Sequence, residues 1–411
     1  MRILHVIHDN PFEVPGGAQS YSASLALEQA VQGHECALFF LDRNGRSAGK
    51  LVSREHHGLK LFSGNIDRMP RLMRGFQFRN SYDNPDAFKL FQTVFEHFQP
   101  QLVHVHSLIL LSYRIPQYVR SHHAKLLWTL HDYWPVCHRI VLLDNENDLC
   151  HGSRDGSRCV HCGKPGYNRW PGSMLKPAFK SAFARRNSRL LDALHQAHRL
   201  LAPSQYLQGV YRKLGAPADR LIHSIYGIRP LPRLYAREPK EKLRFGFLGN
   251  PAAHKGTIEL ARCFGSIHNA GLTFYGPTPR GRDLIQIIAA APEDVITFHG
   301  PYKHQDTDKV LRTIDVLVVP SLWQENSPLV IHEALSAGIP VLAFAAGGIQ
   351  ELVQPGVNGW LLPTADFPAL ARTIAELAAE PLLVDQMSLG AALIRPIDDD
   401  ARTCIELAEI D

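Results

Sequence analysis

Two glutamates, Glu325 and Glu333, flank the start of a predicted helix in the second half of the chain. Ser327 is a favourable N-cap and Pro328 suits the first helical position, so we expect a helix from here to Gly338. A helix N-terminus carries roughly half a positive charge and unpaired N–H groups, which favour phosphate. The two carboxylates can meanwhile accept hydrogen bonds from sugar hydroxyls.

Glycines and a histidine provide further groups that suit a phosphorylated sugar. Gly347 and Gly348 form a predicted strand-to-helix turn in which backbone N–H groups can approach an anion. His131 follows an apolar run in the first half, at the end of a predicted strand, with Asp132 beside it. These residue types indicate a site for an activated sugar.

The elements that must position these groups are apolar runs alternating with helical patterns. Such alternation predicts a parallel sheet covered on both faces. Proline-rich residues 229–240 read as a linker, which gives domains at 1–230 and 241–388 and a C-terminal helix at 389–411 that can cross back to the first domain. The predicted strands are 3–7, 37–41, 102–105, 126–130 and 200–202 in the first domain and 245–248, 272–275, 296–298, 316–319 and 341–344 in the second.

The composition is that of a globular protein, with 45% hydrophobic and 20% charged residues. No run approaches the roughly 20 apolar residues that span a bilayer, and the first residues do not resemble a signal peptide, so we expect a cytoplasmic protein. No nucleic-acid-binding motif is found, and we expect no nucleic-acid partner.

Residues between Asp155 and Asp192 are basic, aromatic and free of acidic side chains. Such a stretch suits an anionic membrane surface or an anionic lipid-linked substrate, and would place the protein on the inner face of the membrane. A solvated helix with some core aromatics is the alternative. The basic residues are Arg158, Lys164, Arg169, Lys176, Lys180, Arg185, Arg186 and Arg189.

Four cysteines, Cys137, Cys150, Cys159 and Cys162, lie close together in sequence within a predicted insertion at about 135–165. In a cytosolic chain this clustering favours a tetrahedral structural zinc site. A disulfide, reduced thiols or an iron–sulfur cluster are the alternatives.

The paired glutamates, with the run Glu-Ala-Leu-Ser-Ala-Gly-Ile-Pro-Val from Glu333 onward, resemble glycosyltransferase family 4. That resemblance implies an α/β GT-B fold: two Rossmann-like, doubly wound parallel-sheet domains facing a central cleft. The insertion is similar to one in a cysteine-bearing subset of this family. The implied activity is transfer of a hexose-type sugar from a nucleoside diphosphate sugar to a glycan or lipid-linked hydroxyl acceptor, with retention and without a catalytic metal.

The resemblance also implies roles for individual residues. Glu325 would contact the donor hexose, Glu333 the ribose, and His131 the donor sugar. Lys255 would neutralise the diphosphate, whose charge grows as it leaves. Family members usually carry arginine where this chain has Asn250, so part of that neutralisation is unexplained. The remaining implied donor-binding residues are Gly16 and Gly17 in the first domain and Asn326, Ser327, Leu329, Gly347 and Gly348 in the second.

Two other functions are compatible with the same sequence. The loss of charge at Asn250 suits a non-catalytic scaffold that binds a nucleotide sugar. A nucleotide-sugar hydrolase or epimerase on the same fold is the other alternative.

Overall fold

The computed structural model describes most of the chain as two compact units. One unit comprises Met1–Gly227 together with Ile397–Asp411, and the other comprises Ile228–Pro396. The residues outside the description are 15, 43–48, 67–77, 147, 163–175, 233–241, 268, 291, 293, 388–393 and 411. Much of the predicted linker, as well as Lys164 and Arg169 of the basic stretch, therefore lies outside the described residues.

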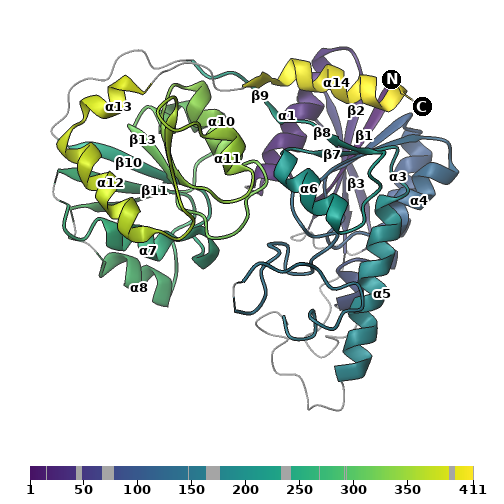
Figure 1. The fold of residues 1–411 in the computed structure, drawn as a ribbon. Helices are drawn as coiled ribbons and strands as arrows, with labels where there is room; N and C mark the ends of the chain where they lie inside the picture. The colour runs from purple at the N-terminus through teal and green to yellow at the C-terminus, as the bar shows by residue number, and fades with distance from the viewer. Residues whose placement is uncertain are drawn as a thin grey trace. The chain divides into compact units, whose positions relative to one another are not determined.

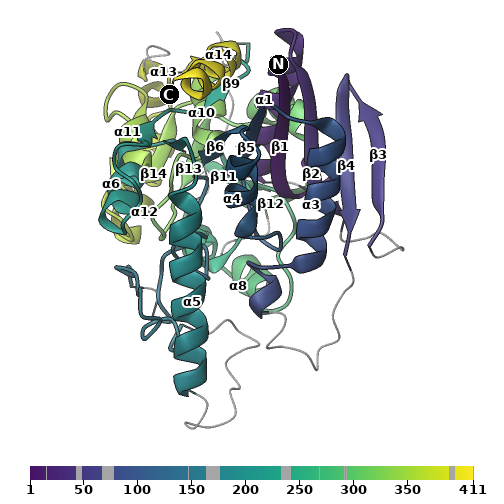
Figure 2. The same cartoon turned by 90° about the vertical axis from the view of Figure 1, so that its right-hand side faces the viewer.

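The first unit contains an eight-stranded sheet in the order β3-β4-β2-β1-β5-β6-β7-β8. All neighbouring pairs are parallel except β3 and β4, which pair antiparallel at one edge (Figure 2). Its central strands are buried apolar runs, as expected where helices cover both faces. The strands are β1 (Arg2–Asp9), β2 (Glu35–Asp42), β3 (Leu51–His56), β4 (Leu59–Asn65), β5 (Leu102–Val105), β6 (Lys125–Thr129), β7 (Arg199–Ala202) and β8 (Leu221–His223).

Two helices of the first unit begin at a side-chain cap. Asn84 caps α3 by accepting from the Asp86 and Ala87 amides, and Ser204 caps α6 by accepting from the Leu207 amide. The helices are α1 (Gly17–Val31), α3 (Pro85–Phe98), α4 (Arg114–Ser121), α5 (Lys176–Leu194), α6 (Gln205–Lys213) and α14 (Ile397–Glu409), shown in Figure 1.

Helix α14 is separated from the rest of the first unit by the whole second unit, yet packs against α1 and β6. Its side chain Asp400 is fully buried and accepts two hydrogen bonds through Oδ2. One comes from the Tyr21 hydroxyl at 2.8 Å and the other from the Gly227 amide at 2.7 Å. A buried carboxylate is tolerated when donors of this kind satisfy it.

The second unit contains a parallel six-stranded sheet in the order β12-β11-β10-β13-β14-β15. Its core is apolar and packs α7 and α12 on the sheet. The strands are β10 (Leu243–Leu248), β11 (Ala270–Tyr275), β12 (Ile296–Gly300), β13 (Val316–Val319), β14 (Val341–Phe344) and β15 (Gly359–Leu362). The helices are α7 (Thr257–Cys263), α8 (Arg282–Ile288), α9 (Thr307–Leu311), α10 (Leu329–Ser336), α11 (Ile349–Leu352), α12 (Phe367–Ala379) and α13 (Leu382–Gln386). The short strands β9 (Gly227–Ile228) and β16 (Arg395–Pro396) lie where the chain passes from one unit to the other.

The predicted α/β class is confirmed, and every predicted strand is present, several longer by one to three residues. Strands β3, β4, β8 and β15 were not predicted. Most β3 side chains are exposed, so this edge strand lacks the apolar run by which a buried strand is recognised in sequence. The C-terminal helix expected at 389–411 begins only at Ile397, because Arg395 and Pro396 form the short strand β16; residues 389–393 lie outside the described residues.

The Asp400 contacts give a first prediction. Asp400→Ala leaves the Tyr21 hydroxyl and the Gly227 amide buried without their acceptor, which should lower the free energy of unfolding by ~2–4 kcal/mol. Urea denaturation followed by circular dichroism measures this. Asp399→Ala, on the exposed side of the same helix turn, is the matched control and should change it by less than ~1 kcal/mol. Equal small losses would contradict the anchoring role.

Candidate functional site

The Glu325 side chain is the centre of a compact polar cluster in the second unit. It is 5% exposed, and its Oε1 atom accepts from Ser321 Oγ at 2.7 Å and from Trp323 Nε1 at 2.8 Å. The Lys255 ammonium also donates to this oxygen and lies 5.2 Å from the centre of the Trp323 ring. The carboxylate is therefore held in one place by three donors, one of them charged.

The glycine turn after β14 is built directly against the backbone of Glu325. Gly347 forms a β-bridge with Glu325, and the Gly348 amide donates to the Glu325 carbonyl at 2.7 Å. Gly347 has φ +62°, and a Cβ added there would lie 2.2 Å from that carbonyl oxygen. Only glycine fits this approach. The structure thus brings Glu325, Gly347, Gly348 and Lys255 together, four of the residues that the sequence singled out.

Helix α10 begins at Leu329, so the prediction that Ser327 is its N-cap is wrong. Pro328 occupies the N-cap position, and Ser327 Oγ instead bonds His332 Nε2 at 2.8 Å. Because the Ser327 hydroxyl is bonded to His332, it does not cap the helix. Glu333 still lies in the second turn, and Gly338 follows the helix end with φ +79°, as the sequence indicates.

Glu333 is buried on α10, only 6% exposed, and this environment changes its protonation. Burial raises the pKa of the Glu333 carboxyl to about 8. Its Oε1 lies 3.3 Å from Nδ1 of half-exposed His304, whose pKa is lowered by burial and by Arg229. At neutral pH both groups are therefore mostly uncharged, so this contact is not an ion pair.

Three further residues predicted to bind the sugar donor lie in the second unit, close in sequence to members of this cluster. Asn250 is exposed in the loop after β10, whereas Asn326 is buried directly after Glu325. Leu329 is the first residue of α10. Lys255 ends the 3-10 helix η3 (Ala253–Lys255), where the following Gly256 approaches the Pro320 carbonyl too closely for a side chain.

In the first unit, Gly16 and Gly17 stand where β1 leads into α1. Gly17 is the first residue of α1, and Gly16 precedes it in an extended conformation. His131 follows β6, and both of its ring nitrogens are engaged within the unit. Its Nδ1 lies 2.6 Å from the Tyr226 hydroxyl, and its Nε2 lies 3.0 Å from His106 Nδ1. Burial lowers the pKa of His131 to about 3, so the ring is neutral.

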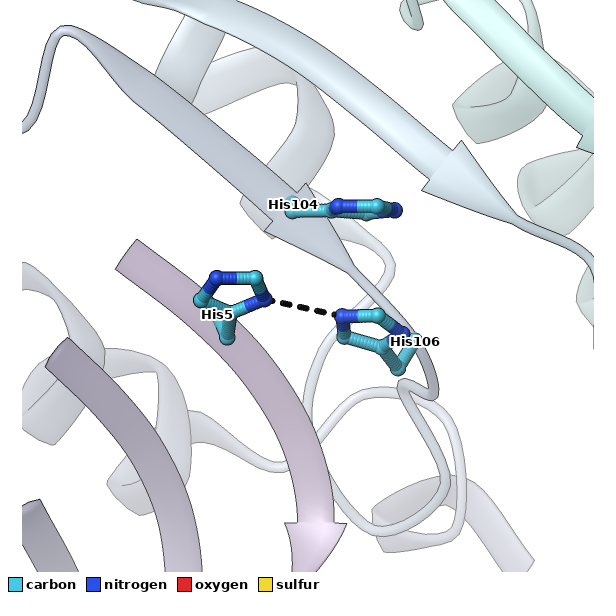
Figure 3. Close-up of side chains that lie close together, drawn as sticks. All are labelled: His5, His104 and His106. Carbon is cyan, nitrogen blue, oxygen red and sulfur yellow. Dashed lines mark hydrogen bonds between the residues drawn. The ribbon is translucent and has the colours of Figure 1, made fainter. Parts of the chain in front are cut away.

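His5, His104 and His106 form a buried stack beside His131 (Figure 3). Their candidate ligand atoms lie within 4.8 Å of one another. However, the ring planes are only 16–29° from parallel, and imidazole lone pairs lie in those planes, so stacked rings do not converge on one ion as zinc ligands do. His5 Nδ1 and His106 Nε2 instead share a hydrogen bond of 3.0 Å. This geometry favours a hydrogen-bonded stack over a metal site.

A small hollow in the first unit borders His131 and is also lined by His106, Ser107 and Asp132. Burial raises the pKa of the Asp132 carboxyl to about 6, although the Trp134 amide, which donates to it at 2.7 Å, opposes that shift. The hollow is small, with room for about one water molecule.

The four clustered cysteines carry free thiols, three of them buried. Burial raises the pKa of Cys137 to about 11 and also raises those of Cys159 and Cys162, with Cys150 contributing to each shift. None of the four belongs to a group of three ligating side chains within 4.8 Å among the described residues. The zinc site stays a prediction.

Several residues of these sites were missed in the sequence. Ser321 and Trp323 hold Glu325, His304 contacts Glu333, and Gln29 and His5 extend the histidine cluster. A polar residue inside a buried apolar strand, such as His5, is the signal that would have identified the histidine cluster. No sequence pattern indicates His304 as a site residue, because its contact with Glu333 depends on the conformation of the loop after β12.

Two family models match the chain in succession. The model of glycosyltransferase family 4 matches residues 15–226, more than half of the chain, and that of glycosyl transferases group 1 matches residues 242–380. Two curated relatives are a D-inositol 3-phosphate glycosyltransferase of Saccharomonospora viridis and the amylovoran biosynthesis glycosyltransferase AmsK of Erwinia amylovora. The first is 30% identical over 49% of this chain and the second 32% over 28%. The matched part of the chain spans 47% and 27% of these relatives' own lengths, less than half.

Solved structures share the fold over nearly the whole chain. Sucrose-phosphate synthase from Thermosynechococcus elongatus superposes with a TM-score of 0.68 at 18% identity, covering 98% of this chain and 94% of that one. HepE from Anabaena, in complex with UDP and glucose, gives 0.67 at 17% identity, covering 99% of both chains. With these GT-B neighbours and the two family models together, the chain belongs to glycosyltransferase family 4, the group 1 glycosyl transferases.

Proposed function

We propose that this protein transfers a hexose-type sugar from a nucleoside diphosphate sugar to a hydroxyl acceptor, with retention of configuration. The observation that carries the proposal is the cluster of Glu325, Lys255 and the Gly347–Gly348 turn in the second unit. It combines a fixed carboxylate for sugar hydroxyls with a cation and the Gly347 backbone for phosphate, while the Gly348 amide holds the turn against Glu325. HepE, a protein of the same fold, binds UDP and glucose, which supports a nucleotide-sugar donor.

In this proposal the Lys255 ammonium, which contacts Glu325 in the structure, binds the diphosphate of the donor. Stabilising the departing diphosphate is the main chemical task, because negative charge grows there in the transition state. Lys255 and the backbone of Gly347 bind the diphosphate, Gly348 fixes the turn against Glu325, and the Glu325 carboxylate orients the hexose. No protein nucleophile takes part: the leaving phosphate assists the acceptor on the same face of the sugar.

Glu333 is the proposed contact to the nucleotide ribose. With a pKa of about 8 its carboxyl is protonated at neutral pH, so it can both donate to one ribose hydroxyl and accept from the other. His304, at 3.3 Å, extends this contact surface.

We assign acceptor binding to the first unit. Asp132 borders its hollow, while His131, Gly16 and Gly17 keep their proposed contacts to the donor sugar and its phosphate. AmsK, named for amylovoran biosynthesis, is a family relative, and we propose that the acceptor here is a glycan or lipid-linked glycan of polysaccharide biosynthesis.

A cluster of arginines in the first unit supports an anionic acceptor or membrane surface. Asp83 is fully buried, and Arg79, Arg114 and Arg189 lie within 2.7–3.8 Å of its carboxylate while remaining 35–57% exposed. One carboxylate thus faces three cations. Exposed Arg185 extends this positive surface along α5. Among the described residues, no helix is long and apolar enough to cross a membrane.

Asn250 favours a second candidate, a scaffold that binds a nucleotide sugar without transferring it. It is exposed and uncharged beside the loop that carries Lys255, where the family usually has arginine. A transferase turns over the nucleotide sugar, whereas a scaffold binds it without turnover.

The donor proposal is tested first by thermal shift with a panel of nucleoside diphosphate sugars, since a ligand that binds the folded state raises its Tm. With the donor so found, Glu325→Ala should lower kcat/KM for transfer at least ~100-fold, because hexose orientation is lost. Glu376→Ala, exposed on α12, is the control and should match the wild type. Wild-type transfer by Glu325→Ala would refute the assignment, and a thermal shift without any turnover would favour the scaffold.

Glu333 gives a prediction about pH and stability. Its folded pKa of about 8 lies above the usual 4.5, so its contribution to stability is present below pH 4.5 and is lost as pH rises through about 8. The loss is of the order of a few kcal/mol. Glu333→Gln, which cannot ionise, should lose less stability than the wild type between pH 5 and pH 8.5 in urea denaturation. Glu376→Gln should follow the wild-type profile, and parallel profiles for all three proteins would contradict a buried neutral Glu333.

The anionic-surface proposal is tested by co-sedimentation with phosphatidylserine-containing vesicles at low salt. Arg185→Glu changes the surface charge by two units and should weaken binding ~10-fold or more, at about 1 kcal/mol per basic residue. Lys309→Glu, exposed in the second unit, makes the same charge change elsewhere and should have little effect. Equal weakening by both variants would show that net charge alone is responsible.

A further inference from the structure

A continuous hydrogen-bonded chain runs through the core of the first unit, from Gln29 on α1 to Tyr226. Gln29 Oε1 lies 2.9 Å from His5 Nε2, and His5 Nδ1 lies 3.0 Å from His106 Nε2, the bond drawn in Figure 3. His106 Nδ1 lies 3.0 Å from His131 Nε2, and His131 Nδ1 lies 2.6 Å from the Tyr226 hydroxyl. Three bonds thus connect His131 to Gln29 through two other histidines, and a fourth connects His131 to Tyr226.

The sheet and α1 explain why these side chains meet. His5 on β1 pairs in register with His104 on β5, and His106 lies two residues further on, so all three rings share one face of the sheet. His131 follows the neighbouring strand β6. Helix α1 covers this face and brings the buried Gln29 to His5.

All hydrogen bonds of this series are donated in the same direction, from Tyr226 toward Gln29. A glutamine carbonyl oxygen can only accept, so His5 must donate to it from Nε2. A neutral imidazole has one donor and one acceptor, so His5 Nδ1 accepts from His106 Nε2, and His106 Nδ1 accepts from His131 Nε2. His131 Nδ1 then accepts from the Tyr226 hydroxyl. Every histidine in the chain is the Nε2–H tautomer.

The surroundings keep these rings uncharged. Burial lowers the pKa of His5 to about 4 and that of His131 to about 3, and holds that of His106 well below its usual value. The neighbouring His104 and His8 act in the same direction. A proton added to the chain would put a positive charge in a fully buried site.

We propose that Gln29, His5 and His106 are positioning residues that hold His131 as a neutral Nε2–H imidazole, so that a substrate hydroxyl can bond to His131 only by donating to Nδ1 in place of Tyr226. The inference rests on the proposed function for the identity of that hydroxyl, a sugar hydroxyl. It assigns a task in the reaction to residues that do not touch substrate.

His104 provides a matched control inside the same stack. It is as fully buried as His5, is its partner in the sheet, and bonds Thr129 Oγ1 at 2.7 Å through Nε2 rather than joining the chain. His5→Leu therefore cuts the chain, while His104→Leu removes an equally buried ring beside it. Both variants should lower Tm by similar amounts.

The kinetic test compares these two variants with the wild type in sugar transfer. We expect His5→Leu to lower kcat ~10–100-fold with the donor KM within ~3-fold, since a misplaced catalytic contact costs rate more than ground-state binding. His104→Leu should keep kcat within ~3-fold. Gln29→Met should lower kcat as His5→Leu does, and Gln29→Glu, which retains an oxygen facing His5, should restore most of it. Equal losses of kcat in His5→Leu and His104→Leu would overturn the proposal.

A second measurement does not depend on transfer. Nitrogen chemical shifts of 15N-labelled histidine distinguish the two neutral tautomers and the cation, and the signal absent from His131→Gln identifies His131. We expect an Nε2–H ring that does not titrate between pH 7.5 and pH 5, and a changed tautomer population in Gln29→Met. An Nδ1–H or cationic His131 in the wild type would overturn the proposal. A wild type that transfers no sugar but shows the expected tautomer would refute the proposed function and leave the positioning chain standing.

Discussion

The backbone of Glu325 lies so close to Gly347 that no side chain fits between them, and the arrangement of the second unit's site depends on this contact. It joins the loop after β13 to the turn after β14, two neighbouring parallel strands. The Glu325 carboxylate is thereby placed where Lys255, from a third strand end, can reach it. The ends of three strands of one sheet thus meet at a single residue, Glu325, in the place where open α/β sheets bind their ligands.

The first unit meets a different constraint, the cost of burying polar groups. Its core holds histidines, a tyrosine hydroxyl and a carboxylate that would each destabilise the fold if left without partners. The side chains hydrogen-bond one another across strands and helices, from Gln29 to Tyr226 and from Tyr21 to Asp400. The same contacts that make this polar core tolerable also fix the protonation of His131.

Sequence patterns predicted the interior of this protein better than its edges. Runs such as Val316–Val319 and Val341–Phe344 are buried on both faces, so their composition identifies them as strands. The exposed strand β3 carries no such pattern. Among the functional groups, Glu325 and Gly347 stood out through spacing and turn chemistry. His304 and Gln29 could not be predicted, because their partners are distant in sequence and only the folded chain brings them together. Ser327 was expected to cap α10, but its hydroxyl bonds the side chain of His332 in that same helix instead.

Helix α14 belongs to a unit from which it is separated by residues 228–396. A ribosome adding ~5–20 residues per second takes on the order of 10–30 s to supply that intervening stretch. During this interval the Tyr21 hydroxyl and the Gly227 amide have no Asp400 to bind, and the face of α1 that α14 covers stays open to water. The second unit is contiguous and needs no such return. The unit that is synthesised first is therefore the one that completes its native structure last.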